Sequence, residues 1–316
     1  MGSTTWLQWE KHFEQHEPPT EDKVIQVDVV DQAHPKLISV SESLSPIEKQ
    51  DLISLMREYI DIFAWSYEDM PGLDPDVAMH HLRIKPDAKP VKQQQRQFQP
   101  DIMDVIKIKI HKLIECDFIW DEQHLYWVAN IIPVLNKNRK IRVWIDFHNL
   151  NAACFKDKFP LPIINIMIDT TCGFEKKSFI DDFLGYNQVK MPLDDEKHTS
   201  FRTPLGVYCY RVILFRLKNT GATYHRAMST IFRDHLRKML EYYVDDIAVK
   251  SHSRNNHLDD LRTMFDIMQA HPLKMNSTKS FLGVSSGKLF EFIITLHPKK
   301  FTLILTKSRP FRACNL

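Results

Sequence analysis

Two adjacent aspartates, Asp245 and Asp246, are the residues in this 316-residue sequence whose type and spacing most suggest chemistry. They lie between two apolar, β-prone runs within residues 241–251, a pattern that predicts two strands joined by a tight turn that presents both acids. Like charges held together resist ionising side by side, so the pair favours a cation, and carboxylate oxygens suit a hard ion such as Mg²⁺. The same residues also fit a solvated hairpin turn, so the surrounding motifs must decide.

A second acidic run lies upstream, at residues 178–188, and contains Asp181 and Asp182. A third run, residues 215–228, lies between the two acidic ones. In this order and spacing, the three runs resemble the carboxylate motifs and the template- and nucleotide-contacting segment of the reverse transcriptase palm. The resemblance is strongest to the gypsy type of plant long-terminal-repeat retrotransposons, and extends more loosely over residues 63–295.

The resemblance implies an α+β fold with the fingers and palm of a right-hand polymerase. An antiparallel palm sheet with packed helices would follow a mostly helical or irregular N-terminal extension, and the thumb would be truncated. The expected divisions are a polyprotein connector at 1–86, fingers at 87–157 and 189–220, palm with a primer-grip hairpin at 158–188 and 221–298, and an unrelated or truncated tail at 299–316.

By the same resemblance, Asp181, Asp245 and Asp246 are the catalytic and metal-binding residues. Asp181 matches the family's first metal ligand, whereas Asp182 stands where the family usually has a small residue. Two Mg²⁺ ions, which Mn²⁺ can replace, would support nucleotidyl transfer by an RNA-directed DNA polymerase. The implied partners are an RNA or DNA template with its primer, and deoxynucleoside triphosphates.

The resemblance also assigns residues to nucleotide binding. Lys140 and Arg142, on a predicted hairpin of the fingers, would neutralise the triphosphate, although several basic residues in a turn are also typical of a solvated surface. Tyr186, five residues after Asp181, would be an aromatic steric gate against ribonucleotides, or an ordinary buried strand aromatic; Phe215 would also contact the nucleotide. Contacts with template and primer are expected from Lys218, Asn219, Gly221, Tyr243 and Phe292.

Glycines that the family has are replaced at four positions, by Asp117, Arg139, Arg216 and Glu291, and the whole chain contains only 8 glycines. Where glycine permits a positive φ, a bulky charged residue costs about 1–3 kcal/mol or displaces the backbone. Arg216 is the most consequential, because its bulk could block the nucleotide pocket or its charge could add a phosphate contact.

Three hypotheses therefore stay open. The chain is a reverse transcriptase domain with its aspartates working, a decayed copy that keeps the palm fold and at most binds nucleic acid, or a palm polymerase that uses ribonucleotides. Tyr186 disfavours the third, and the lost glycines favour the second.

Composition sets the wider frame. The 42 basic and 40 acidic residues nearly cancel, so any nucleic-acid binding requires a local basic groove. Five scattered cysteines without a C-x-x-C pair indicate reduced thiols, and no apolar run approaches membrane-spanning length. We expect an intracellular protein, cytoplasmic in a retrotransposon particle or nuclear, without a membrane partner.

Local patterns predict several elements directly. Ser45, Pro46 and Glu48 form a capping box that starts a helix. Helices are also expected at 100–115 and 221–239, a fingers hairpin from strands at 127–134 and 142–147, and a second hairpin at 287–294.

Overall fold

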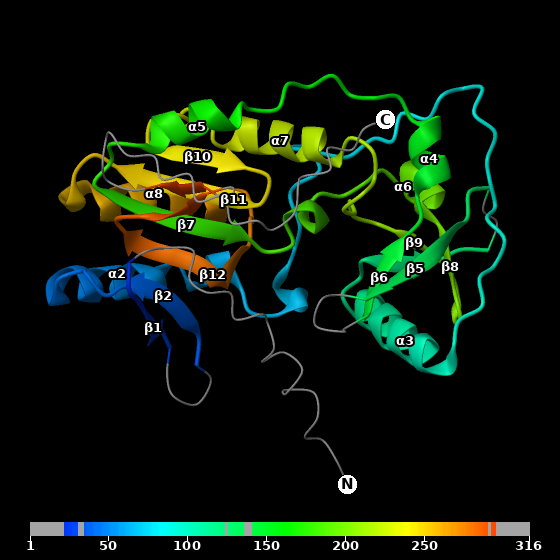
Figure 1. Cartoon of the computed structure of the whole chain (residues 1–316), viewed down its shortest axis with the longest axis horizontal. Coiled ribbons are helices and arrows are strands. Elements are labelled where there is room, and N and C mark those ends of the chain that lie inside the picture. The colour runs from blue at the N-terminus through cyan, green and yellow to red at the C-terminus, as the bar shows by residue number, and fades with distance from the viewer. Residues whose placement is uncertain (1–21, 31–34, 124–125, 136–140, 290–291, 295–316) are drawn as a thin grey trace, which may run out of the picture.

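The computed structural model describes residues 22–30, 35–123, 126–135, 141–289 and 292–294. Its elements gather into two lobes, each with its own sheet and its own apolar core (Figure 1). We call the lobe with the seven-stranded sheet the palm lobe and the lobe with the five-stranded sheet the fingers lobe. The mixed α+β architecture expected from the sequence is confirmed.

The palm sheet places the two acidic runs on neighbouring strands. Strands β7, β10 and β11 pair in antiparallel fashion, and β12 pairs antiparallel with β7 but parallel with β2 and β3. The strands, in sheet order, are β1 (Val24–Asp28), β2 (Leu37–Ser41), β12 (Met275–Val284), β7 (Lys176–Asp182), β11 (Asp246–Ser251) and β10 (Leu240–Tyr243), with β3 (Phe63–Ala64) beside β12.

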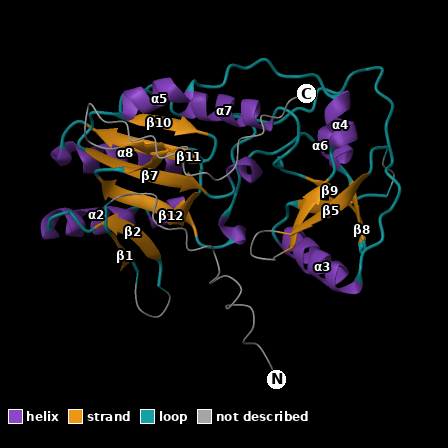
Figure 2. Ribbon diagram, viewed as in Figure 1, coloured by secondary structure: helices purple, strands orange, loops and turns teal. Residues whose placement is uncertain are grey.

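Four helices complete the palm lobe: α2 (Pro46–Glu58), α5 (Ile164–Thr171), α7 (Thr220–Ile231) and α8 (His257–Ala270). Figure 2 shows α5 and α7 in line above β10. The capping box predicted for α2 is confirmed, because the Glu48 amide donates to Ser45 Oγ and the Ser45 amide donates to Glu48 Oε2 at 2.7 Å.

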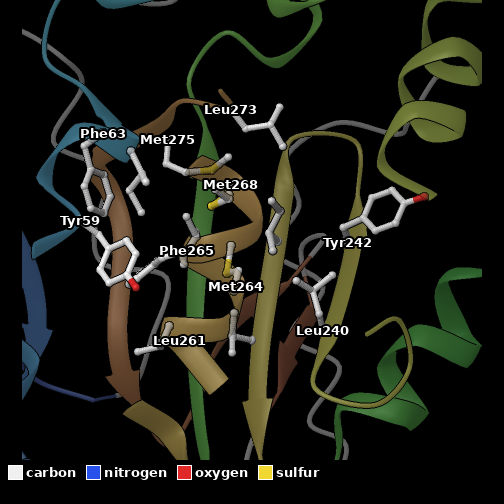
Figure 3. Close-up of a cluster of buried hydrophobic side chains, with 14 of the residues drawn as sticks. Tyr59, Phe63, Leu240, Tyr242, Leu261, Met264, Phe265, Met268, Leu273 and Met275 are labelled. Carbon is white, nitrogen blue, oxygen red and sulfur yellow. The ribbon is translucent and has the colours of Figure 1, made fainter. Parts of the chain in front are cut away.

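The described part of the N-terminal extension is mostly helical or irregular, as expected, but it also supplies short strands to the palm sheet. Residues 24–64 contribute three strands to the palm sheet, and α2 buries Leu52, Leu55 and Met56 in the palm core. Figure 3 shows Tyr59 and Phe63 within the same cluster as Phe265, Met268 and Met275. The apolar face of α2 is buried here, in part by contact with α8. The division of the chain into domains stays a prediction.

The fingers lobe is built on strands β4 (Ile119–Asp121), β9 (Gly206–Tyr210), β8 (Phe201–Thr203), β5 (Ala129–Leu135) and β6 (Ile141–Ile145), in that order. Helices α3 (Pro100–Glu115), α4 (His148–Ala153) and α6 (Leu193–Glu196) belong to this lobe. The predicted bounds of α3 are confirmed, and its Ile106 and Ile110 are fully buried. The predicted hairpin is confirmed as β5–β6, with Val134 opposite Arg142.

Helix α7 is shorter than predicted. The pattern of 221–239 predicts one continuous helix, but α7 ends at Ile231 and a turn follows in which Arg237 has φ +62°. Phe232 and Leu240 are both fully buried in the palm core, so the chain must reverse between them to start β10. Burial of these two side chains therefore overrides the helical periodicity.

Short elements complete the description. The predicted hairpin at 287–294 is present as antiparallel strands β13 (Gly287–Leu289) and β14 (Phe292–Ile294). The 3₁₀ helices are η1 (Ile60–Ile62), η2 (Tyr67–Asp69), η3 (Gly185–Gln188), η4 (Lys197–Thr199) and η5 (Arg254–Asn256). Within the described ranges, none of the helices is long and apolar enough to cross a membrane.

Candidate active site

The hairpin of β10 and β11 brings the three predicted catalytic aspartates to one end of the palm sheet. Val244, at φ +53°, and Asp245 form its turn, and Asp246 opens β11. Across the next pairing, Asp246 lies opposite Asp181 of β7, and the Asp182 amide donates to the Asp245 carbonyl at 2.8 Å. The strand–turn–strand arrangement predicted from the sequence is therefore confirmed.

Asp245 carries the unsatisfied charge of this site. Its Oδ1 is buried and has no hydrogen-bond partner among the described residues. Burial raises the pKa of Asp245 to about 6, with a further contribution from the nearby Asp181 charge. Burial also raises the pKa of Asp181, although Lys279 opposes that shift. A buried carboxylate oxygen without a donor, next to a second carboxylate, is a place where a cation would be stabilising.

Three residues of β12 surround Asp181 and were missed by the sequence reasoning. Lys279 Nζ lies 3.3 Å from Asp181 Oδ2, and Asn276 Nδ2 donates to the same oxygen at 3.3 Å. Ser280 Oγ accepts from the Asp181 amide at 3.3 Å. The sequence separation from Asp181 is more than ninety residues, so only the pairing of β12 with β7 reveals these neighbours.

The described part of the chain holds no ready cluster of three or more Asp, Glu, His or Cys side chains able to bind a metal ion. Asp181 is paired with Lys279, whereas Asp245 Oδ1 has no hydrogen-bond partner among the described residues. The donors nevertheless suit a hard divalent ion, because they are carboxylate oxygens that repel each other without one.

Asp182 has a separate role in the structure. It is almost completely buried and accepts hydrogen bonds from Tyr224 Oη and from Gln188 Nε2. Burial raises the pKa of Asp182 well above its usual value. Gln188 also donates to the carbonyls of Phe183 and Lys274. Asp182 therefore joins β7 to α7 through its own hydrogen bonds, and the assignment of Asp181 as the metal ligand stays a prediction.

Gly185 shows how closely the backbone approaches the carboxylates. A Cβ at this position would lie 2.5 Å from Asp182 Oδ2 and 3.0 Å from Asp245 Oδ1. No side chain fits there without moving one of the two acids.

Tyr186 and Phe215 lie beside the carboxylates. The Tyr186 ring is 5.4 Å from the Tyr224 ring and 6.3 Å from that of Phe215, centroid to centroid. Burial and the Asp245 charge raise the pKa of the Tyr186 hydroxyl. Phe215 is 71% exposed, so a large aromatic face is open next to the site. Their roles toward a nucleotide stay predictions.

The fingers hairpin brings one expected cation into the described structure. Arg142 lies on β6 and is exposed, whereas Lys140 lies in the turn outside the described residues. Trp144 lies two residues after Arg142 on the same face of β6, and the Arg216 guanidinium lies 3.5 Å from the centre of its ring.

The expectation of strain at the replaced glycines agrees with the structure at the two positions that it describes. Arg216 has φ +86° and Asp117 has φ +56°, both in the left-handed region that favours glycine. Arg139 and Glu291 lie outside the described residues.

The residues predicted to contact template and primer have other partners here. Lys218 Nζ donates to the carbonyls of Asn151 and Cys154 at 3.0 and 2.8 Å, and Asn219 Nδ2 donates to Phe155. These bonds tie the start of α7 to the end of α4. Gly221 lies in the first turn of α7, Tyr243 ends β10, and Phe292 opens β14, where its side chain is outside the description. Their contacts with nucleic acid stay predictions.

Comparison with known proteins adds an independent line of support. The family model described as reverse transcriptase (RNA-dependent DNA polymerase) matches residues 134–304, more than half of the chain. The retrovirus-related Pol polyprotein from transposon opus of Drosophila melanogaster is 28% identical over 169 residues, covering 54% of this chain and 17% of the polyprotein. The corresponding polyprotein from transposon 412 of the same species is 26% identical over 270 residues, 84% of this chain and 22% of its own length.

The fold is shared with solved structures as well. The foamy viral protease–reverse transcriptase in complex with an RNA/DNA hybrid aligns with a TM-score of 0.70 at 18% identity, over 80% of this chain and 33% of that one. The chain thus spans about a fifth of the curated relatives' length and a third of the structural relative. With the acidic hairpin, the paired acidic strand and the family match in agreement, this chain belongs to the reverse transcriptase (RNA-dependent DNA polymerase) family.

Proposed function

We propose that the chain is the RNA-directed DNA polymerase part of a plant gypsy-type retrotransposon Pol polyprotein, a partial and degenerate copy that adds deoxynucleotides to a primer on an RNA or DNA template. One observation carries the proposal. This chain belongs to the reverse transcriptase family, its Asp181 and Asp245 lie at neighbouring strand ends, and Asp245 Oδ1 is buried without a hydrogen-bond partner among the described residues. A structural relative in complex with an RNA/DNA hybrid supports a template–primer as the partner. Its place would be inside the cell, in a cytoplasmic particle or the nucleus.

Reverse transcriptases as a family use divalent metal ions, and the proposed ions here are two Mg²⁺, replaceable by Mn²⁺. Asp181, Asp245 and Asp246 would hold them. When bound, the ions would supply activation of the primer 3′-hydroxyl and stabilisation of the leaving pyrophosphate. The orphan oxygen of Asp245 and the repulsion between its charge and that of Asp181 support this assignment.

The chain's own residues would position the substrates. Tyr186 and Phe215 form an aromatic wall beside the carboxylates, on which the sugar and base of a nucleotide can pack. A ring held under the sugar leaves no room for a 2′-hydroxyl, so deoxynucleotides would be favoured. Arg142, on the fingers hairpin, would offer a cation to the triphosphate.

A second candidate, a decayed copy that keeps only the fold, has specific observations in its favour. Arg216 and Asp117 have positive φ angles, which residues with side chains rarely adopt. Lys279 forms an ion pair with Asp181, one of the proposed metal ligands. A decayed copy would at most bind nucleic acid weakly, through phosphate contacts.

Primer extension separates the two candidates. The purified chain is given an RNA template, a DNA primer, deoxynucleotides and Mg²⁺ or Mn²⁺, beside Asp245→Asn. Asp234→Asn, at an exposed aspartate outside the site, is the matched control. We expect extension by the parent and by the control, and its loss in Asp245→Asn. Absence of extension by a parent that unfolds cooperatively would refute the polymerase and leave the decayed copy.

A further inference from the structure

The loop between the lobes holds an arginine in an unusual conformation. Arg216 has φ +86°, and the Asn151 side chain binds the segment twice: its Nδ2 donates to the Arg216 carbonyl at 2.7 Å, and its Oδ1 accepts from the Lys218 amide at 2.8 Å. Lys218 Nζ adds two bonds to the end of α4. The backbone of Arg216 is thus fixed by the fingers lobe in a conformation that its side chain alone would not select.

The side chain of Arg216 turns onto the fingers sheet. Its guanidinium lies 3.5 Å from the centre of the half-buried Trp144 ring. Among the described residues, the Trp144 ring is the partner of the guanidinium, and no carboxylate forms an ion pair with it. Asp146, the residue after β6, has its Oδ2 3.9 Å from Arg96 Nη2, and this pairing offsets the Asp146 charge. Arg216 therefore presents a positive charge to solvent at this surface.

Contact through the ring face leaves the donors of an arginine available. The five N–H groups of a guanidinium lie in its plane, so an aromatic face below that plane uses none of them. A planar cation with unused donors matches phosphate oxygens, which guanidinium groups bind through two parallel hydrogen bonds.

The position of this pair links the two lobes. The ring of Phe215, the residue before Arg216, lies 6.3 Å from the Tyr186 ring, centroid to centroid. The charge of Asp245 contributes to the raised pKa of the Tyr186 hydroxyl. Arg142 lies on the same face of β6 as Trp144. The carboxylates, the aromatic wall and the two arginines thus follow one another from palm to fingers, and both arginines lie on the fingers side of the proposed nucleotide site.

We propose that Arg216, held flat on Trp144, is a phosphate-binding residue for the incoming nucleoside triphosphate and acts beside Arg142. The proposal rests on the proposed function for the identity of the ligand. It also decides between the two effects expected of Arg216: the guanidinium turned onto Trp144 adds a phosphate contact and does not fill the pocket. Trp144 is the positioning residue of the pair.

The test is equilibrium binding, which needs no turnover. Binding of dTTP, thymidine and inorganic tripolyphosphate to the full chain is measured with Mg²⁺ for the parent, Arg216→Gly and Trp144→Ala. Arg237→Gly is the matched control, because Arg237 is also an exposed arginine at a positive φ, +62°, but lies in the turn after α7. Thermal unfolding of each variant reports whether the fold is kept.

We expect Arg216→Gly to weaken dTTP and tripolyphosphate about tenfold, as the loss of one charge-assisted contact implies, and to leave thymidine unchanged. Its thermal midpoint should not fall, since glycine suits a positive φ. Arg216→Lys should recover only part of the affinity, because an ammonium cannot make the two parallel bonds. Trp144→Ala should weaken the same ligands severalfold, and the double variant should lose less than the two single losses combined.

Two results would overturn the proposal, and a third would separate it from the proposed function. Unchanged or tighter dTTP binding by Arg216→Gly would mean that the arginine is idle or obstructs the pocket. Weaker binding of a template–primer with unchanged tripolyphosphate would assign Arg216 to nucleic acid instead. A parent that binds tripolyphosphate through Arg216 but never extends a primer would keep the phosphate subsite and refute only the polymerase.

Discussion

The two ends of the same three palm strands treat buried charge in opposite ways. At one end, Lys250 Nζ lies 2.8 Å from Glu241 Oε1, and both side chains are almost fully buried. Lys177 Nζ donates to the carbonyls of Phe174 and Ser285 in the same region. Each buried cation there has a partner, as structural charges in protein interiors do.

A histidine at that paired end is also fully accommodated. His257 lies between Ser178 and Ser251, with ring nitrogen to oxygen distances of 2.8 Å on both sides. Burial, together with the charges of Lys176 and Lys177, lowers the pKa of His257 to about 3. The ring is therefore neutral and satisfied, and nothing at this end calls for a ligand.

At the other end of the strands, the carboxylates are left without enough positive charge. Asp245 Oδ1 has no partner among the described residues, and Asp181 relies on the half-exposed Lys279. An arrangement that opposes folding persists where it serves a function. The contrast teaches that unsatisfied charge, and not acidity alone, distinguishes the end of the sheet to which we assign the proposed function.

Breaking the buried ion pair of Lys250 and Glu241 should have the largest effect on stability. Among the described residues, Lys250→Met leaves the buried Glu241 with Thr170 as its one side-chain donor, and we expect a loss of about 3–5 kcal/mol in the free energy of unfolding. Urea denaturation measures it. The double variant Lys250→Met/Glu241→Leu should recover most of the loss, whereas Arg262→Met, at an exposed pair with Glu58, should have a much smaller effect because solvent screens that pair. A single variant as stable as the parent would show that this pair is not structural.

Removing the buried charge of Asp245 should change the pH dependence of stability. The pKa of Asp245 in the folded chain, about 6, lies above its usual value, so ionisation opposes folding. The unfolding free energy contributed by this group should therefore rise as pH falls from above 6 toward 4. In metal-free buffer, Asp245→Asn should be about 2–3 kcal/mol more stable than the parent at pH 7.5 and equal to it near pH 4.

The difference between the two proteins isolates Asp245 from other titrating groups. Because the pKa of His257 is lowered in the folded chain, its contribution to the free energy of unfolding falls once pH drops below the ordinary histidine pKa. This loss is the same in both proteins. Asp234→Asn should track the parent at every pH. A constant gap between Asp245→Asn and the parent would mean that Asp245 is not strained by ionisation.

A smaller effect is expected behind the site. Tyr224→Phe removes the hydroxyl that bonds to Asp182 and leaves that carboxyl with Gln188, at a cost of about 1–2 kcal/mol. Chemical denaturation measures the cost, and Tyr126→Phe, at an exposed tyrosine, is the matched control. An unchanged midpoint in Tyr224→Phe would show that the Asp182 brace contributes nothing.

The smallest effect belongs to a strained position outside both ends. Asp117→Gly removes the strain of φ +56° but also an exposed ion pair with Arg211, so a net gain of about 0–1 kcal/mol is expected. Asp117→Ala loses the ion pair and keeps the strain. Thermal unfolding should therefore rank glycine above alanine, and the reverse order would contradict the strain.

Much of the local structure could be predicted because its causes are local. The capping box of Ser45 and Glu48 fixes the start of α2, and the apolar spacing of Ile106 and Ile110 fixes the buried face of α3. The hairpin at Asp245 follows from two apolar runs around a turn. The positive φ at Arg216 was also expected, because a family glycine is replaced there.

The features that escaped prediction depend on contacts between distant parts of the chain. The sequence around Lys279 and Asn276 contains no pattern that predicts their contacts with Asp181, which lies on another strand of the sheet. Lys218 seemed a basic residue for nucleic acid, but the end of α4 is close enough to bind it. Helix α7 stops early because Phe232 and Leu240 both enter the core, which no helical pattern encodes.

The response of thermal stability to Mg²⁺ tests most directly whether the carboxylate end is left unsatisfied for a metal ion. Mg²⁺ should raise the unfolding temperature of the parent, because an ion that binds only the folded chain stabilises it. Asp245→Asn should begin at a higher unfolding temperature without metal and should gain little from Mg²⁺. An equal gain in both proteins, or none in the parent, would contradict the assignment of these aspartates to a metal ion.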